Sequence, residues 1–212
     1  MMGYMVYFNV VRSKDIINSP YNVRLDSMAD RVVRGEILDR DGNVLAETEV
    51  DEDGDEKRVY PYGELYAHVV GYDSKGKSGL ESAENFNLLT SNAFFVEKLL
   101  TEFQDKKNIG DNVVTTLDTN LQQAAYNALG SYKGAVVVME VSTGKILSMV
   151  SKPDFNPNTV VEMWDKWVED EESSVLLNRV TTGLYPPGST FKIFSTLEYL
   201  KENNGNYQNY SY

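Results

Sequence analysis

The chain contains no cysteine and a single histidine, His68. The absence of cysteine excludes disulfide bonds, thiol nucleophiles and thiolate metal sites. A Ser-His-Asp triad would depend on His68 alone. We therefore expect His68 to be a packed residue within the apolar segment 65–70, and we look elsewhere for chemistry.

Positive charge is also scarce, and the formal net charge is −12 at pH 7. This balance argues against nucleic acid or an anionic membrane surface as the main partner. The 212 residues have an ordinary apolar fraction, which is enough to bury the core of one or two globular domains.

A long hydrophobic run is missing as well. The apolar stretch Met1–Val11 ends at Arg12 and Lys14. It is about half of the roughly 20 residues that a membrane-spanning helix needs, and it lacks the positive n-region of a signal peptide. Two interpretations stay open: a buried or amphipathic terminal segment, or the end of a transmembrane anchor.

Turn signals in the first half predict β-structure. Asp41-Gly42-Asn43 separates the short apolar segments 36–38 and 44–46, which indicates a hairpin, and a second turn at Asp53-Gly54 precedes the segment 57–60.

The acidic run between these strands resembles a calcium loop in one respect only. Asp51, Asp53 and Asp55 alternate as calcium ligands do, but Gly54 is out of register and no glutamate closes the loop. We expect a solvated hairpin tip and no metal site.

The second half mixes helices and strands. Asp118 is expected to cap a helix that ends at Gly130. The apolar runs 134–141 and 145–150 flank Ser142-Thr143-Gly144 and predict a hairpin buried on both faces, at the centre of a sheet covered by helices. Thr159 and Glu162 predict a capping box for the next helix.

A possible catalytic pair lies near the C-terminus. Tyr185-Pro186-Pro187-Gly188 predicts a rigid turn, and an apolar helix is expected from Ser189 to about Asn203. A serine at a helix start lies where the helix dipole favours an alkoxide or an oxyanion. Lys192, three residues on, projects from the same side, so its amine can serve Ser189 as a base.

The pair has a simpler interpretation, because Ser-x-x-Lys also occurs at Ser74/Lys77 and Ser142/Lys145. The first copy lies in the Gly-rich polar segment 73–79 and the second in a predicted hairpin turn, so neither has a helix to orient the side chains. For Ser189 and Lys192 the alternative is a helix N-cap followed by a solvated surface lysine.

Several blocks in order resemble the penicillin-binding proteins. Three blocks are similar to the start and the later parts of that family's non-catalytic pedestal. They are Arg34-Gly35-Glu36-Ile37-Leu38-Asp39-Arg40-Asp41-Gly42, Tyr62-Gly63-Glu64-Leu65 and Gly79-Leu80-Glu81. Those similar to its transpeptidase domain are Thr115-Thr116-Leu117-Asp118, Gly134-Ala135-Val136-Val137, Thr143-Gly144-Lys145, Asn178-Arg179 and Ser189-Thr190-Phe191-Lys192.

The resemblance implies an α+β fold: an elongated, mostly-β pedestal followed by an incomplete, β-lactamase-like α/β transpeptidase domain. It implies that Ser189 is the nucleophile that attacks the D-Ala-D-Ala carbonyl of a peptidoglycan stem peptide, and that Lys192 is the general base. β-Lactams would acylate the same oxygen. No cofactor or metal is implied. Because lysine is protonated in neutral water, the site must be enclosed for this chemistry.

The family's Ser-x-Asn and Lys-Thr-Gly motifs have no counterpart in residues 193–212. We therefore expect a fragment of a monofunctional, class B type transpeptidase that is inactive by itself. The expected parts are a remnant of a transmembrane anchor (1–14), the pedestal (15–110) and the first part of the transpeptidase domain (111–212).

The expected location of the parent is the cell membrane, with a single-pass anchor and extracytoplasmic domains. Its expected partners are stem peptides, β-lactams and cell-wall synthesis proteins that bind the pedestal. Two other functions stay open: a non-catalytic interaction module, and a β-lactam sensor or β-lactamase relative.

Overall fold

The structure is a computed structural model that describes residues 4, 7, 8, 32–91 and 107–208. The chain divides into two compact units, Met1–Thr182 and Gly183–Tyr212, which are described separately. Most of the expected anchor remnant at residues 1–14 lies outside the described residues. Among the residues that are described, no helix is both long and apolar enough to cross a membrane.

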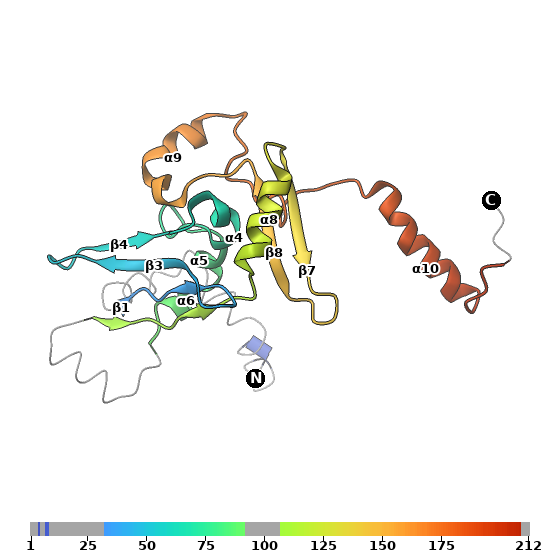
Figure 1. Cartoon of the computed structure of the whole chain (residues 1–212), viewed down its shortest axis with the longest axis horizontal. Coiled ribbons are helices and arrows are strands. Elements are labelled where there is room, and N and C mark those ends of the chain that lie inside the picture. The colour runs from blue at the N-terminus through green and yellow to red at the C-terminus, as the bar shows by residue number, and fades with distance from the viewer. Residues whose placement is uncertain (1–3, 5–6, 9–31, 92–106, 209–212) are drawn as a thin grey trace. The chain divides into compact units, whose positions relative to one another are not determined.

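A four-stranded sheet forms the centre of the first part of the chain, in the order β4-β3-β2-β6 (Figure 1). Strands β2 (Ile37–Leu38) and β3 (Val44–Val50) form the predicted hairpin around the turn at Gly42, whose φ of +86° suits glycine. β4 (Glu56–Val59) pairs antiparallel with β3, and β6 (Val113–Val114) pairs parallel with β2. The acidic run is the exposed tip of the β3–β4 hairpin.

A second pairing joins two short segments that are far apart in sequence. β1 (Val32–Val33) runs parallel to β5 (Asn108–Ile109). The backbone N–H groups of Gly35 and Gly110 donate to Leu88 O and Val33 O, which holds these segments together. At Gly110 a Cβ would lie 1.9 Å from Leu88 O, so only glycine fits this close approach.

Short helices cover this sheet. They are η2 (Gly63–Tyr66), α4 (Ala67–Val70), α5 (Gly79–Ala83) and α6 (Asn85–Leu88). A buried apolar cluster that includes Ile37, Leu45, Val70 and Leu88 fills the space between helices and sheet. Burial of such side chains is the main stabilising contribution of the unit.

His68 is packed, as predicted. It is buried in α4, and its ring lies edge-on to Phe155 at 5.2 Å between ring centroids. Its Nε2 forms a hydrogen bond of 3.0 Å with Pro153 O. Burial lowers the pKa of His68, because desolvation disfavours the charged imidazolium.

The hairpin of β7 (Gly134–Met139) and β8 (Ile146–Lys152) lies against helix α8 (Thr119–Leu129) (Figure 1). Asp118 caps α8 as predicted, because its Oδ1 accepts from the N–H groups of Asn120 and Leu121, both at 3.0 Å.

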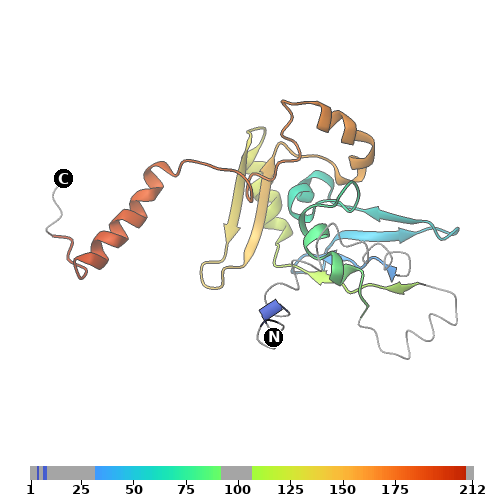
Figure 2. The same cartoon turned by 180° about the vertical axis from the view of Figure 1, so that it is seen from behind.

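The prediction that both faces of this hairpin are buried was wrong within the unit Met1–Thr182. Residues of β7 alternate between half-buried and exposed, and Val137 and Met139 are 42% and 53% exposed. α8 covers one face, and in Figure 2 the opposite face of the hairpin is turned to the viewer. A continuous apolar run indicates a strand but does not say which element of the chain covers its second face.

A single buried glutamine, Gln122, joins three parts of this unit. Its Nε2 donates to Leu65 O at 2.8 Å and to Met149 O at 2.9 Å. Its Oε1 accepts from Ser148 Oγ and from Met149 N, both at 2.9 Å. The side chain is fully buried, and its amide is used as both donor and acceptor to connect η2, α8 and β8.

Helix α9 (Val160–Glu169) follows the short 3₁₀-helix η3 (Pro157–Thr159). Its Val160, Trp164 and Trp167 contribute to a second apolar cluster with Tyr72 and Phe155. The predicted capping box was wrong, because Thr159 makes no side-chain cap. Its hydroxyl donates instead to Asn156 O at 3.1 Å, and Asn156 caps η3.

Candidate active site

The predicted catalytic pair lies in the second unit, at the start of a helix. The backbone enters the 3₁₀-helix η4 (Gly188–Phe191) from Pro187, and α10 (Lys192–Glu202) follows without a break. Gly188 has a φ of +55°, a conformation that glycine adopts without the steric cost of a side chain. The turn predicted at Tyr185-Pro186-Pro187-Gly188 is not seen as such, because residues 183–187 form neither a helix nor a turn and the 3₁₀-helix begins directly at Gly188.

Ser189 and Lys192 are one turn apart in this helix. Phe191 (φ −64°, ψ −20°) and Lys192 (φ −60°, ψ −26°) have 3₁₀ dihedral angles, and the Lys192 N–H donates to Ser189 O. In an α-helix, residues three apart differ by about 60° around the axis. In a 3₁₀-helix three residues complete one turn, so the two side chains are eclipsed on the same side.

The hydroxyl of Ser189 is not used to cap the helix. The residue at the N-cap of η4 is Pro187, the one at the N-cap of α10 is Phe191, and neither makes a side-chain cap. The local side-chain bond comes from Thr190, whose Oγ1 donates to Pro187 O at 2.5 Å. Ser189 therefore does not have the position or the hydrogen bond of a helix N-cap.

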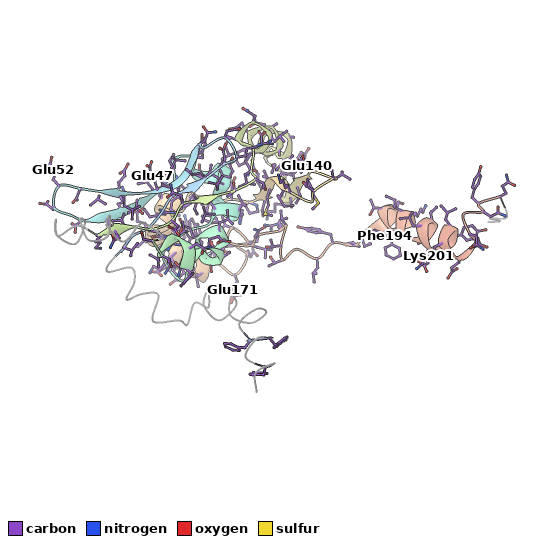
Figure 3. All side chains as sticks on the ribbon, turned by 90° about the horizontal axis from the view of Figure 1, so that it is seen from below. Glu47, Glu52, Glu140, Glu171, Phe194 and Lys201 are labelled. Atoms are coloured by element: carbon purple, nitrogen blue, oxygen red, sulfur yellow. The ribbon has the colours of Figure 1, made fainter. Side chains whose placement is uncertain are left out.

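The helix that carries the pair has an exposed apolar side. Phe191, Phe194 and Leu197 recur along it, and Phe194 is 65% exposed within its unit. Figure 3 shows the Phe194 side chain projecting from α10, with Lys201 further along the helix. The rings of Phe191 and Phe194 are 5.9 Å apart between centroids. An exposed apolar helix of this kind is typical of a segment that packs inside a larger domain.

The other two Ser-x-x-Lys sequences lie in turns, as predicted. Ser142 and Lys145 belong to the β7–β8 connection. Ser74 and Lys77 form a turn in which the Lys77 N–H donates to Ser74 O at 3.0 Å. Of the three copies, Ser189 and Lys192 alone belong to a helix among the described residues.

Both side chains of the pair are exposed within this unit. A lysine base needs a desolvated environment or a neighbouring cation before it can take a proton near neutral pH. Nothing in the described part of residues 183–208 encloses the pair.

In the described ranges, no group of three or more His, Cys, Asp or Glu is placed to hold a metal ion.

Two family models match the chain in the order of its parts. Residues 34–113 match the model described as "Penicillin binding protein A dimerisation domain", and residues 134–210 match "Penicillin binding protein transpeptidase domain". The second range contains Ser189 and Lys192.

Individual relatives agree with these models. The chain is 42% identical over 155 residues to the peptidoglycan D,D-transpeptidase PbpA of Mycolicibacterium smegmatis, an alignment that covers 66% of this chain and 31% of that protein. It is 29% identical over 175 residues to the peptidoglycan D,D-transpeptidase MrdA of Escherichia coli K12, which covers 66% of this chain and 28% of the relative. The chain therefore spans about a third of the length of the curated relatives it matches.

Solved structures give the same result. The D,D-transpeptidase domain of a peptidoglycan glycosyltransferase from Eggerthella lenta has a TM-score of 0.70 and 38% identity, covering 82% of this chain and 38% of that one. Penicillin-binding protein A from M. tuberculosis, in its penicillin G acyl-enzyme complex, has a TM-score of 0.71 and 36% identity, covering 81% and 43%. The α+β fold is confirmed, and the chain belongs to the penicillin-binding protein family.

Proposed function

We propose that this chain is part of a peptidoglycan D,D-transpeptidase in which Ser189 is the nucleophile and Lys192 the general base. The observation that carries the proposal is the one-turn relation of these two residues at the start of an apolar helix, inside the range that matches the transpeptidase model. The substrates are the stem peptides of peptidoglycan, and β-lactams compete for the same serine.

The proposed reaction has two half-reactions. Ser189 Oγ forms a bond to the penultimate D-alanine carbonyl carbon of the stem peptide as its proton passes to Lys192 Nζ. The peptide bond to the terminal D-alanine breaks, and that proton goes to the leaving amine. An amine of a neighbouring stem peptide then attacks the acyl-serine carbonyl: its nitrogen forms the new amide bond, the ester bond to Ser189 Oγ breaks, and the proton that the amine loses passes through Lys192 to Ser189 Oγ.

The helix start suits this chemistry. Ser189 is the second residue of η4, so it lies at the positive end of the helix dipole, which favours the negative charge that develops on the attacked carbonyl. One oxyanion-hole donor contributes about 3 kcal/mol in acyl-transfer enzymes. The family's Ser-x-Asn and Lys-Thr-Gly motifs would complete and enclose the site, so residues 1–212 alone are expected to react slowly.

The division of the chain is part of the proposal. Residues 15–110 would form the pedestal and residues 111–212 the first part of the transpeptidase domain, which is supported by the matches at 34–113 and 134–210. Residues 1–14 would be the remnant of a single-pass anchor that holds the parent in the cell membrane. The pedestal would bind other proteins of cell-wall synthesis.

The test uses the longest protein encoded by the gene that contains this sequence. It is incubated with a fluorescent penicillin, quenched in denaturant and separated on a gel. We expect a covalent band that Ser189→Ala abolishes and that Ser195→Ala, a change at another serine of the same helix, retains.

The other outcomes separate the alternatives. If the full-length protein gives no band, the transpeptidase proposal is wrong and the interaction module is favoured. A band that forms and then disappears rapidly through hydrolysis indicates a β-lactamase. Rapid stoichiometric labelling of residues 1–212 alone would show that the missing motifs are not needed for acylation.

A further inference from the structure

The segment that precedes η4 is held by the side chain and the backbone of Asn178. The Nδ2 of Asn178 donates to His68 O at 3.1 Å, which joins this segment to α4, 110 positions earlier in the chain. Its Oδ1 accepts from Val180 N at 3.0 Å. Its backbone carbonyl accepts from Thr182 N at 3.0 Å and from Thr182 Oγ1 at 2.7 Å. These four hydrogen bonds fix the backbone as far as Thr182.

A second polar side chain, Ser151 of β8, holds the peptide groups on both sides of Asn178. Its Oγ donates to Leu177 O at 3.2 Å and accepts from Arg179 N at 3.0 Å. Ser151 is buried, so movement of the segment would leave its hydroxyl unpaired, which costs free energy. The position of Asn178 is therefore fixed relative to both α4 and β8.

The connection from this fixed point to η4 is short and stiff. Five residues, 183–187, separate Thr182 from the start of η4, which contains Ser189. An extended chain spans at most about 3.3–3.6 Å per residue, so this connection has little slack. Pro186 and Pro187 restrict it further, because the proline ring fixes φ near −65°, and Pro187 has a φ of −67°. A connection of this kind absorbs little movement of its first residue.

We propose that Asn178 is a positioning residue for the acylation of Ser189, and that it acts through its hydrogen bond to His68 O by fixing the start of the segment 183–187. The inference rests on the proposed function, in which Ser189 Oγ must meet a carbonyl carbon while Lys192 takes its proton. A displacement of about 1 Å can reduce such a rate about a hundredfold. Asn178 would act through the backbone and would not touch the substrate.

Asn156 provides a closely matched control. Its Oδ1 accepts from Asn158 N at 2.9 Å and from Asn158 Nδ2 at 3.0 Å, and its carbonyl accepts from Thr159 N and Thr159 Oγ1, both at 3.1 Å. Asn156 and Asn178 are both half-buried, and each side chain makes two hydrogen bonds. Asn156 precedes η3 and α9, however, and not the segment that leads to Ser189.

The experiment measures labelling of the full-length protein by a fluorescent penicillin as a function of time and of penicillin concentration. It separates the rate constant of acylation at saturating penicillin from the fraction of protein that is finally labelled. Asn178→Ala should lower the rate constant about ten- to a hundredfold, because the serine is less well placed, and should change the half-saturating concentration little. Asn156→Ala should leave the rate constant unchanged. Loss of folded protein would reduce the labelled fraction and not the rate constant.

A conservative variant isolates the bond to α4. Asn178→Asp keeps an oxygen that accepts from Val180 N but removes the amide that donates to His68 O. We expect its rate constant of acylation to be as low as that of Asn178→Ala. A wild-type rate constant in Asn178→Asp would show that the bond to His68 O is not needed, and it would overturn the proposal.

Hydrogen exchange tests the same role without the reaction. The N–H groups of Thr190 and Lys192 donate within η4, to Pro187 O and to Ser189 O. In the full-length protein, Asn178→Ala should raise the exchange rate of peptides that cover residues 183–192 several-fold, because the segment opens more often, and Asn156→Ala should not.

The two measurements separate failure of this inference from failure of the proposed function. If the wild type forms no acyl-enzyme, the proposed function is wrong, and the exchange rates alone decide whether Asn178 holds the segment that carries Ser189. Equal exchange rates in Asn178→Ala and Asn156→Ala would overturn the positioning role. Normal acylation of the wild type with the same rate constant in Asn178→Ala would overturn it as well, and would leave Ser189 as the nucleophile.

Discussion

Thr119 Oγ1 donates to Asp39 Oδ2 at 2.5 Å, which joins the first residue of α8 to the β2–β3 turn 80 positions earlier in the chain. Asp39 is fully buried and also accepts from Asp41 N at 2.8 Å and Asn43 N at 2.9 Å. The Tyr66 hydroxyl is 2.9 Å from Thr119 Oγ1. This bond therefore links the β2–β3 turn to the helix that supports the β7–β8 hairpin.

The first prediction concerns this link. Thr119→Val removes the hydroxyl but keeps the shape, and it should lower the free energy of unfolding by about 1.5–3 kcal/mol, because a buried carboxylate loses one donor. Urea unfolding measures the change. Thr143→Val is the control, because its hydroxyl faces Glu140 in an exposed turn. A loss of the same size in both variants would contradict the special role of the buried bond.

The second prediction concerns the buried charge cluster of Arg34, Arg58 and Glu81. Glu81 is fully buried and accepts from both Arg34 and Arg58. Glu81→Gln leaves two buried guanidinium groups without their shared counter-ion, so we expect a loss of about 3–5 kcal/mol in unfolding free energy. Glu52→Gln at the exposed hairpin tip should change it by less than about 0.5 kcal/mol. Equal stability of the two variants in urea would refute this account of the cluster.

Sequence patterns could predict elements whose cause is local. The Asp118 cap, the turn at Gly42 and the β7–β8 hairpin each depend on neighbouring residues, and each was correct. The shared carboxylate of Glu81 could not be found in this way, because its partner Arg34 lies 47 positions away and the contact exists only after folding. The Arg34-Gly35 and Gly79-Leu80-Glu81 blocks contained the residues, but no spacing indicated that they meet.

At the candidate site, too, the features with a local cause could be predicted and those that depend on tertiary contacts could not. The apolar spacing of the helix and the order of Ser189 and Lys192 are local, so the sequence predicted the helix to within a residue or two. The 3₁₀ geometry of the first turn of this helix was not predicted, because a single turn of a 3₁₀-helix and of an α-helix show the same spacing of apolar residues in the sequence. Both side chains of the pair are exposed in the described residues, and the enclosure that the proposed reaction requires would come from tertiary contacts, which no local pattern describes.

The third prediction concerns Gln122. Gln122→Met has a similar volume but cannot replace the four hydrogen bonds to Leu65, Ser148 and Met149. We expect a loss of at least about 2 kcal/mol, because buried polar groups are left unpaired. The neighbouring Gln123→Met is a matched control on the exposed side of α8, where the side chain bonds only Asn127. If Gln123→Met lowers the free energy of unfolding as much as Gln122→Met does, the hydrogen bonds of Gln122 do not explain the loss.

The fourth prediction uses the single histidine. The folded pKa of His68 is lowered below its ordinary value of 6.5 by burial, so the unfolded chain binds this proton more readily. The free energy of unfolding should therefore fall as the pH drops from about 7.5 through 6.5 and towards the folded pKa. The measurement is urea unfolding of wild type and His68→Gln across this range.

The difference between the two proteins isolates His68 from the carboxylates that titrate at lower pH. Their difference in unfolding free energy should shrink as the pH falls, because glutamine does not gain a charge. A difference that is constant from pH 7.5 to 5.5 would show that His68 titrates alike in the folded and unfolded states.

The fifth prediction concerns the base. Lys192→Arg keeps a positive charge one turn from Ser189 but removes an amine that can accept a proton. In the full-length protein we expect the rate of acylation by penicillin to fall at least about a hundredfold, which is the range for loss of a general base. Stopped-time labelling measures this rate, and Lys201→Arg in the same helix is the control. An unchanged rate in Lys192→Arg would remove Lys192 from the mechanism.

The most direct test of the central claim is the position of the covalent bond. The full-length protein is treated with penicillin G, digested and sequenced by tandem mass spectrometry. We predict that the added mass lies on Ser189, in the peptide that contains Pro186-Pro187-Gly188, and that it is absent from the Ser189→Ala protein. An adduct on any other residue, Ser195 included, would contradict the assignment of Ser189 as the nucleophile.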